Sequence, residues 1–104
     1  MRRCCSWSRL ATGFAILTLT VTAQSQEFPE VAKVCVTCHG RDGIGTTPLN
    51  PNLAGQSSIY LVQQLTAFRD GKRKSEVMNI TAANLTDEEI FTIAEYYESR
   101  LSCR

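Results

Sequence analysis

The chain has 104 residues, which is enough for one small domain, and its composition excludes several classes of protein. Lysine and arginine number 11 and aspartate and glutamate 10, so the formal net charge of +1 gives no reason to expect a nucleic-acid partner. No stretch of about 20 apolar residues is present, which excludes a multi-span membrane protein. Five cysteines are many for this length, and we therefore expect cysteine chemistry to carry the function.

Residues 1–23 have the pattern of a secretory signal peptide. Arg2, Arg3 and Arg9 make the start basic, and an uncharged, mostly apolar run follows at 10–21. We expect cleavage near Ala23, which places one domain, residues 24–104, in the periplasm without stable membrane insertion. An uncleaved N-terminus that anchors the chain to a membrane is the alternative, but the apolar run is shorter than the roughly 20 residues that a span needs.

Three helices are predicted downstream of this leader. The first covers residues 28–39, where apolar side chains recur three and four residues apart. The second runs from a serine cap at 57 or 58 to about residue 70. The third begins at a capping box, in which Thr86 caps the helix and Glu89 reaches back to it, and continues to the chain end.

Two long segments separate these helices. Residues 40–56 are rich in Gly, Pro, Asn and Thr, which predicts an ordered loop. Residues 72–85 lack a clean period, which predicts irregular structure. A domain of this size buries only about 60% of its unfolded surface, and long loops lower that fraction. We therefore expect disulfides, a metal or a cofactor to complete the core.

Cys35-Val36-Thr37-Cys38-His39 is the strongest motif, because C-x-x-C-H is the attachment signature of c-type haem. Two thiols add across the two vinyl groups of the porphyrin, and helix positions i and i+3 face the same side. The next residue, His39, is then carried under the iron. The motif predicts one covalently bound haem c, with thioethers to Cys35 and Cys38 and with His39 as an axial ligand.

Three other uses of this motif stay open from the residues alone. A thioredoxin-like redox pair needs a βαβ context, and no strand is predicted before it. A structural zinc site needs four ligands, and the chain after the leader offers only Cys35, Cys38, His39 and Cys103. The third is a simple disulfide between Cys35 and Cys38.

Met78 is the candidate for the second axial ligand. The chain holds no second histidine, and Met78 is the only methionine after the leader. A lone methionine is commonly core filler, but this one lies in the irregular segment, where a loop can cross the distal face of a haem. His/Met ligation fills both axial positions and raises the reduction potential. If Met78 does not ligate, an open haem that binds gas or peroxide is the alternative.

With these motifs the chain resembles a class I c-type cytochrome, of the short bacterial monohaem type and of the half-domains of two-haem relatives. The resemblance implies an all-α fold, with three main helices and long loops around one covalently bound haem, and with the first and last helices crossing. It also implies that the carbonyl of Pro51 accepts a hydrogen bond from Nδ1–H of His39 and orients the ring. Cys103 is a departure from the pattern. The matching residues are 35–40, 51–56, 60–61, 64–65, 68, 71–73, 78, 85–90, 94 and 96–97.

This resemblance implies a periplasmic one-electron carrier that does no bond chemistry and shuttles electrons between redox partner proteins. The alternative is a haem c subunit of a multi-subunit periplasmic dehydrogenase, such as a flavocytochrome sulfide dehydrogenase. The basic cluster, defined as Arg69, Lys72, Arg73 and Lys74, either docks an acidic partner or is a solvated loop face.

Overall fold

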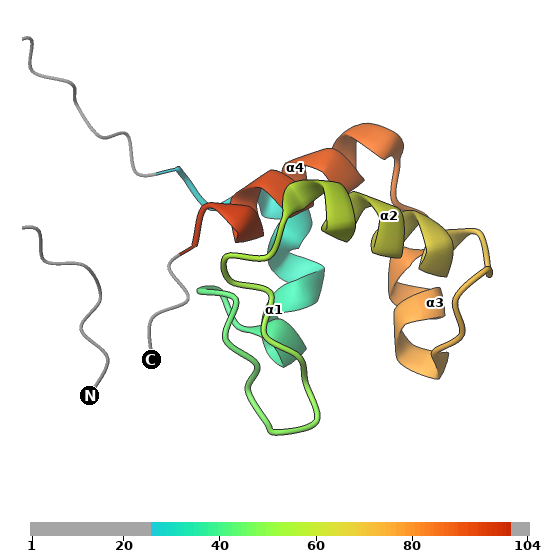
Figure 1. Ribbon diagram of the computed structural model, residues 1–104, viewed down its shortest axis with the longest axis horizontal. Coiled ribbons are helices and arrows are strands. Elements are labelled where there is room, and N and C mark those ends of the chain that lie inside the picture. Colours follow the sequence, from blue (N-terminus) through green and yellow to red (C-terminus); the bar gives the residue numbers. More distant parts are fainter. Residues whose placement is uncertain (1–25, 101–104) are drawn as a thin grey trace, which may run out of the picture.

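The computed structural model describes residues 26–100, and within them the chain forms helices and loops but no strand (Figure 1). The predicted signal peptide and Cys103 lie outside these residues. A short 3-10 turn, η1 (Glu30–Ala32), leads directly into the first α-helix. The four α-helices are α1 (Lys33–His39), α2 (Ser58–Arg69), α3 (Glu76–Ala82) and α4 (Asp87–Glu98). The predicted all-α class is confirmed.

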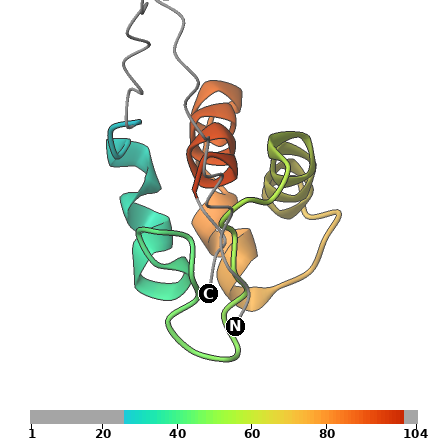
Figure 2. The same ribbon diagram turned by 60° about the vertical axis from the view of Figure 1, so that its left-hand side comes forward.

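Helix α4 is the centre of the arrangement. It packs against α2 and against η1, and Figure 2 shows it between α1 and α2. The first helical segment, which is η1 together with α1, crosses α4, as the resemblance implied (Figure 1). Helices α1 and α3 both extend from the same side of the α2–α4 layer (Figure 1). None of the helices within residues 26–100 is long and apolar enough to cross a membrane.

The core lies where α4 meets α2 and the first helical segment. Its largest fully buried side chains, Ile90, Ile93 and Tyr97, all come from α4. Cys35 belongs to this core, and Met78 packs against it from α3. Within residues 26–100, the buried cluster consists of Ala32, Cys35, Leu61, Leu65, Ile90, Ile93, Ala94, Tyr96 and Tyr97.

The start of α4 is the predicted capping box. The hydroxyl of Thr86 accepts a hydrogen bond from the backbone N–H of Glu89 at 3.2 Å, and the Glu89 carboxylate accepts one from the backbone N–H of Thr86 at 2.9 Å. The side chains of Thr86 and Glu89 thus each accept the backbone N–H of the other residue, and neither N–H has a partner within the helix.

The serine cap predicted for α2 is confirmed in its position but not in its hydrogen bond. Ser57 occupies the cap position, but its side chain makes no capping hydrogen bond. The backbone N–H of Ser58 instead donates to Oε1 of Glu98 at 2.9 Å. A carboxylate is a stronger acceptor than a hydroxyl, and the fold brings one here from the last residue of α4.

The prediction of irregular structure for residues 72–85 is wrong, because this segment contains α3. The helix has only seven residues, too few for a periodic pattern to be visible in the sequence. Met78 and Ala82 face the rest of the domain, whereas Val77 and Ile80 are exposed. The expectation of three main helices therefore becomes four α-helices, two of them only seven residues long.

Candidate functional site

Cys35 and Cys38 lie one helical turn apart on α1, so their thiols share a side of the helix. Cys35 is 6% exposed and belongs to the core, while Cys38 is half-buried. Both are free thiols, so the structure contains no Cys35–Cys38 disulfide. The pair can reach two attachment points on one ligand.

The environment of Cys35 does not suit thiol–disulfide exchange. Burial raises the pKa of its thiol to about 11, so the group is protonated at neutral pH. Exchange chemistry needs a thiolate, which proteins obtain by lowering a cysteine pKa. Within residues 26–100, no group of three or more His, Cys, Asp or Glu side chains is placed to hold a metal ion. Cys103, the fourth residue of the zinc alternative, lies outside the described residues.

His39 is the last residue of α1 and is 7% exposed. Its Nδ1 lies 2.8 Å from the carbonyl oxygen of Pro51. Because a carbonyl only accepts, Nδ1 carries the hydrogen, and Nε2 keeps a lone pair that can bind a metal. In the part of the chain that the structure describes, no hydrogen bond reaches Nε2.

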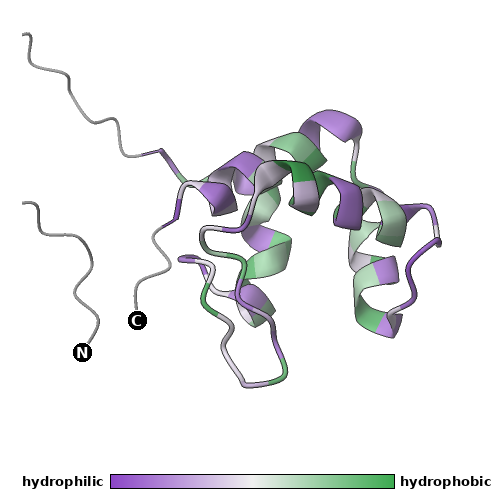
Figure 3. Cartoon of the chain, in the orientation of Figure 1, coloured by the Kyte–Doolittle hydropathy of each residue, from purple (hydrophilic) through white to green (hydrophobic). Residues whose placement is uncertain are grey.

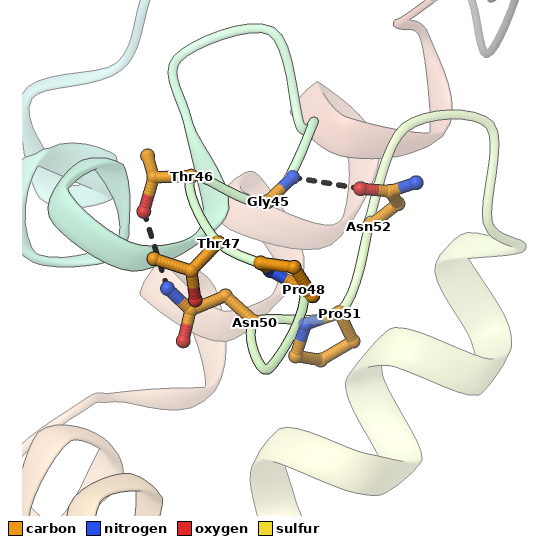
Figure 4. A pocket seen from close by; sticks show the side chains of 7 residues that line it. All are labelled: Gly45, Thr46, Thr47, Pro48, Asn50, Pro51 and Asn52. Atoms are coloured by element: carbon orange, nitrogen blue, oxygen red, sulfur yellow. Dashed lines mark hydrogen bonds between the residues drawn. The ribbon is translucent and has the colours of Figure 1, made fainter.

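The loop that carries Pro51 is closed by its own hydrogen bonds. The backbone N–H of Gly45 donates to Oδ1 of Asn52 at 2.7 Å, and Nδ2 of Asn50 donates to the hydroxyl of Thr46 at 3.1 Å (Figure 4). A hollow of about 560 Å³ runs along this loop; it is lined by Gly45, Thr46, Thr47, Pro48, Asn50, Pro51 and Asn52 (Figure 4). No thiol, imidazole or thioether lines the hollow, so it adjoins the His39 contact only through Pro51.

Met78 is half-buried in the first turn of α3 and packs against the core cluster. The C-terminal end of α1 and the N-terminal end of α3 both point away from the α2–α4 layer (Figure 1). The end of α1, which holds His39, and the start of α3, which holds Met78, therefore lie on the same side of the α2–α4 layer (Figure 1).

Large apolar side chains are exposed beside these groups. Leu49, close to Pro51 in the chain, is 92% exposed, and Val77 and Ile80, on either side of Met78 in α3, are 62% and 78% exposed. These side chains are free to contact an apolar group bound beside them. Two free thiols, an oriented imidazole, one thioether and uncovered apolar surface together fit a haem.

The sequence did not reveal how the backbone after His39 is held. The hydroxyl of Tyr97 donates to the carbonyl of Gly40 at 3.1 Å, and that of Tyr96 donates to the carbonyl of Arg41 at 2.7 Å. Both tyrosines are buried side chains of α4, but the partners of their hydroxyls are 57 and 55 residues away. Nothing in the local sequence indicates such pairs.

Two members of the basic cluster are used within the domain. Arg69 donates to the carboxylate of Asp87 at 2.7 Å and to the carbonyl of Leu85 at 3.1 Å. Arg73 donates to Oε1 of Gln64, and its guanidinium lies over the ring of Phe68. The side chains of Lys72 and Lys74 are exposed. The cluster is therefore partly structural and not simply a solvated face.

Comparison with known proteins agrees with this site. The family model for cytochrome c matches residues 29–100. Cytochrome c-554(548) from Halomonas halodenitrificans is 49% identical over 69 residues, which cover 64% of this chain and 83% of that protein. Cytochrome c4 from Pseudomonas aeruginosa is 42% identical over 69 residues, 66% of this chain and 34% of that protein. The cytochrome subunit of sulfide dehydrogenase from Chlorobaculum tepidum is 41% identical over 63 residues, 61% of this chain and 56% of that protein.

The match therefore spans most of the Halomonas protein, but only about a third of the length of cytochrome c4. The family match extends over all four helices and includes the C-x-x-C-H motif. The chain belongs to the cytochrome c family, as a class I c-type cytochrome with one covalently attached haem c.

Proposed function

We propose that this protein is a periplasmic one-electron carrier, in which Cys35 and Cys38 hold the porphyrin and His39 and Met78 bind the iron. One observation carries the proposal. His39 directly follows two free thiols on α1, and its Nδ1 is occupied by the Pro51 carbonyl at 2.8 Å, which leaves Nε2 for a metal. When bound, haem c supplies an iron that changes reversibly between the ferrous and ferric states.

The roles of the protein groups follow from their positions. Cys35 and Cys38 attach the group to α1, and Pro51 fixes the tautomer and the orientation of His39. The thioether of Met78 is a soft ligand, which favours ferrous iron and so raises the reduction potential. If His39 and Met78 both bound the iron, no position on it would be left for a substrate, which supports electron transfer and not bond chemistry.

Periplasmic location is part of the proposal. It is supported by the basic start and apolar run of residues 1–23, which predict export and cleavage near Ala23. Mass spectrometry of the protein secreted with its own leader tests this point. A mature chain that still begins at Met1 would overturn the cleavage.

The proposed ligation is tested on the full-length protein matured with haem in the periplasm of a bacterial host. We expect the haem to stay attached after denaturation and the oxidised protein to show the weak red charge-transfer band of iron–thioether bonding. Met78→Ala should abolish this band and lower the reduction potential. Ile80→Ala, which trims an exposed apolar side chain of the same helix, is the matched control and should keep the band. A band that persists in Met78→Ala would remove Met78 from the ligand set.

A second candidate function is that of a haem c subunit in a multi-subunit dehydrogenase. It is favoured by the similarity to the cytochrome subunit of sulfide dehydrogenase from Chlorobaculum tepidum. Gel filtration of native periplasmic extract, followed by haem absorbance, separates the two proposals. A free monomer supports the carrier, and stable co-elution with a flavoprotein supports the subunit.

A further inference from the structure

Asn79, the residue after Met78, joins the end of α2 to the start of α3. Its Nδ2 donates to the carbonyl oxygen of Phe68 at 2.7 Å and to that of Arg73 at 2.8 Å. Its Oδ1 accepts from the backbone N–H of Ser75 at 2.7 Å. Because carbonyls only accept and an N–H only donates, these partners define the orientation of the amide. One side chain thus connects three points of the backbone around Met78.

The anchor at Phe68 is a rigid part of the domain. Phe68 is 8% exposed and lies in the last turn of α2, and its carbonyl also accepts from the backbone N–H of Gly71 at 3.2 Å. The segment between α2 and α3, in contrast, is strongly hydrophilic (Figure 3). Its residues Lys72, Arg73 and Lys74 are all exposed. Burial of apolar surface therefore contributes little to the position of this segment, which polar contacts hold to α2. The backbone N–H of Arg73 donates to the carbonyl of Ala67 at 3.0 Å and the Arg73 side chain contacts Gln64 and the Phe68 ring, while Asn79 adds its hydrogen bond to the Phe68 carbonyl.

Helix α3 needs such an attachment. A helix of seven residues is not stable alone, because the cost of nucleation is shared by too few hydrogen bonds. Its start is held by Ser75, whose hydroxyl accepts from the backbone N–H of Met78 at 3.2 Å. Since the N–H of Ser75 is itself held by Asn79, a continuous series of hydrogen bonds runs from the end of α2 to the backbone of Met78.

We propose that Asn79 is a positioning residue for Met78, which keeps the thioether at the iron and slows its dissociation. This inference rests on the proposed ligation of iron by Met78. Asn79 does not touch the haem in this proposal, and it acts through the backbone of α3. Loss of its two donated hydrogen bonds should therefore change the lifetime of the iron–sulfur bond more than the stability of the whole domain.

The test uses the ferric protein with haem bound and measures how fast cyanide replaces the thioether, followed by loss of the red charge-transfer band. Asn79→Asp keeps the acceptor for Ser75 but cannot donate to Phe68 and Arg73, and Asn79→Ala loses all three hydrogen bonds. We expect both variants to bind cyanide at least about tenfold faster than the wild type. Tenfold corresponds to about 1.4 kcal/mol, which is less than the two or three lost hydrogen bonds would contribute at about 1 kcal/mol each. Thr81→Ala removes a hydrogen bond to Val77 within α3 and is the matched control, expected within about twofold of the wild type.

A second measurement separates positioning from general stability. The variant Asn79→Asp is titrated with urea. We expect its red charge-transfer band to disappear at a lower urea concentration than the one at which its helical circular dichroism signal is lost. Wild-type cyanide kinetics in Asn79→Asp, equal acceleration in Thr81→Ala, or coincident loss of band and helix in Asn79→Asp would each overturn the proposal. Met78→Ala distinguishes failure of the proposed Met78 ligation from failure of the proposed Asn79 role. If it retains the band, the ligation fails; if it loses the band while Asn79→Asp behaves as wild type, only the positioning role fails.

Discussion

The hydroxyl of Tyr97, near the end of α4, donates a hydrogen bond of 3.1 Å to the carbonyl oxygen of Gly40, the residue that follows His39. Tyr97 is fully buried. Burial raises the pKa of its phenol well above the ordinary value, so the hydroxyl remains protonated and able to donate at neutral and alkaline pH. The last helix thereby holds the backbone on which the proposed proximal ligand is carried, 57 residues earlier in the chain.

Tyr97→Phe should lower the free energy of unfolding by about 1 kcal/mol, the net contribution of one hydrogen bond. A larger loss is not expected, because the Gly40 carbonyl also accepts from the backbone N–H of Gly43 at 3.3 Å. Denaturant unfolding of the protein with haem bound, followed by circular dichroism, measures the difference. Tyr60→Phe, at a tyrosine that is 44% exposed, is the control and should change stability by less than about 0.5 kcal/mol. Equal losses in the two variants would contradict a specific role for the Tyr97 hydroxyl.

The cap of α2 by Glu98 predicts a dependence of stability on pH. The hydrogen bond from Ser58 lowers the pKa of the Glu98 carboxyl in the folded state. A carboxyl with a lowered folded pKa stabilises the protein above its unfolded pKa, and this contribution is lost as pH falls through the folded pKa. Glu98→Gln should therefore melt below the wild type at pH 7, and the two melting temperatures should converge in acid.

Glu95→Gln is the control for this charge, because Glu95 is an exposed carboxylate on the same helix. Its melting temperature should follow that of the wild type at every pH. If Glu98→Gln melts below the wild type by the same amount at pH 7 and in acid, its effect does not come from the ionised carboxylate.

Gly43 tests how tightly the loop after His39 is packed. Its φ is +80°, and a Cβ there would lie 2.6 Å from the backbone nitrogen of Ala54 and 2.9 Å from a ring carbon of Tyr97. Gly71 has a similar φ of +71°, but a Cβ there would meet only the end of the Lys74 side chain at 3.8 Å. Gly71→Ala should cost about 1–2 kcal/mol for the left-handed conformation alone. Gly43→Ala should cost at least about 1 kcal/mol more, because backbone must move. Denaturant unfolding of both variants measures the two losses of unfolding free energy. Equal losses would show that the loop around Gly43 is not tightly packed.

Arg69 connects the end of α2 to the start of α4 through Asp87 and the Leu85 carbonyl. Arg69→Met should lower the melting temperature. Part of the loss should disappear at high salt, where the attraction to Asp87 is screened in the wild type. Lys72→Met removes an exposed charge from the same cluster and should leave the melting temperature nearly unchanged. A salt-independent loss in Arg69→Met would assign the effect to the Leu85 hydrogen bond instead.

Features set within one or two helical turns could be predicted from the sequence. The C-x-x-C-H spacing places two thiols and an imidazole at the end of α1, and the capping box of Thr86 and Glu89 begins α4 as expected. Both depend only on the rise and turn of a helix and on hydrogen bonds across three residues. The family could be identified for the same reason, because its strongest signature is local.

Contacts between residues that are distant in the chain could not be predicted from local sequence patterns, because only the tertiary structure brings the partners together. The acceptor for the first N–H of α2 comes from Glu98, 40 residues beyond Ser58, whereas the side chain of Ser57 at the cap position makes no capping hydrogen bond. Helix α3 is too short for a sequence period; in the fold, Asn79 hydrogen-bonds it to the end of α2 and Met78 packs against the core. No local rule indicates these partners, since they meet only after α4 has packed against α2 and the first helical segment. The sequence by itself therefore determined which groups are available to bind a haem, and packing around α4 decided how the backbone beside His39 and Met78 is held.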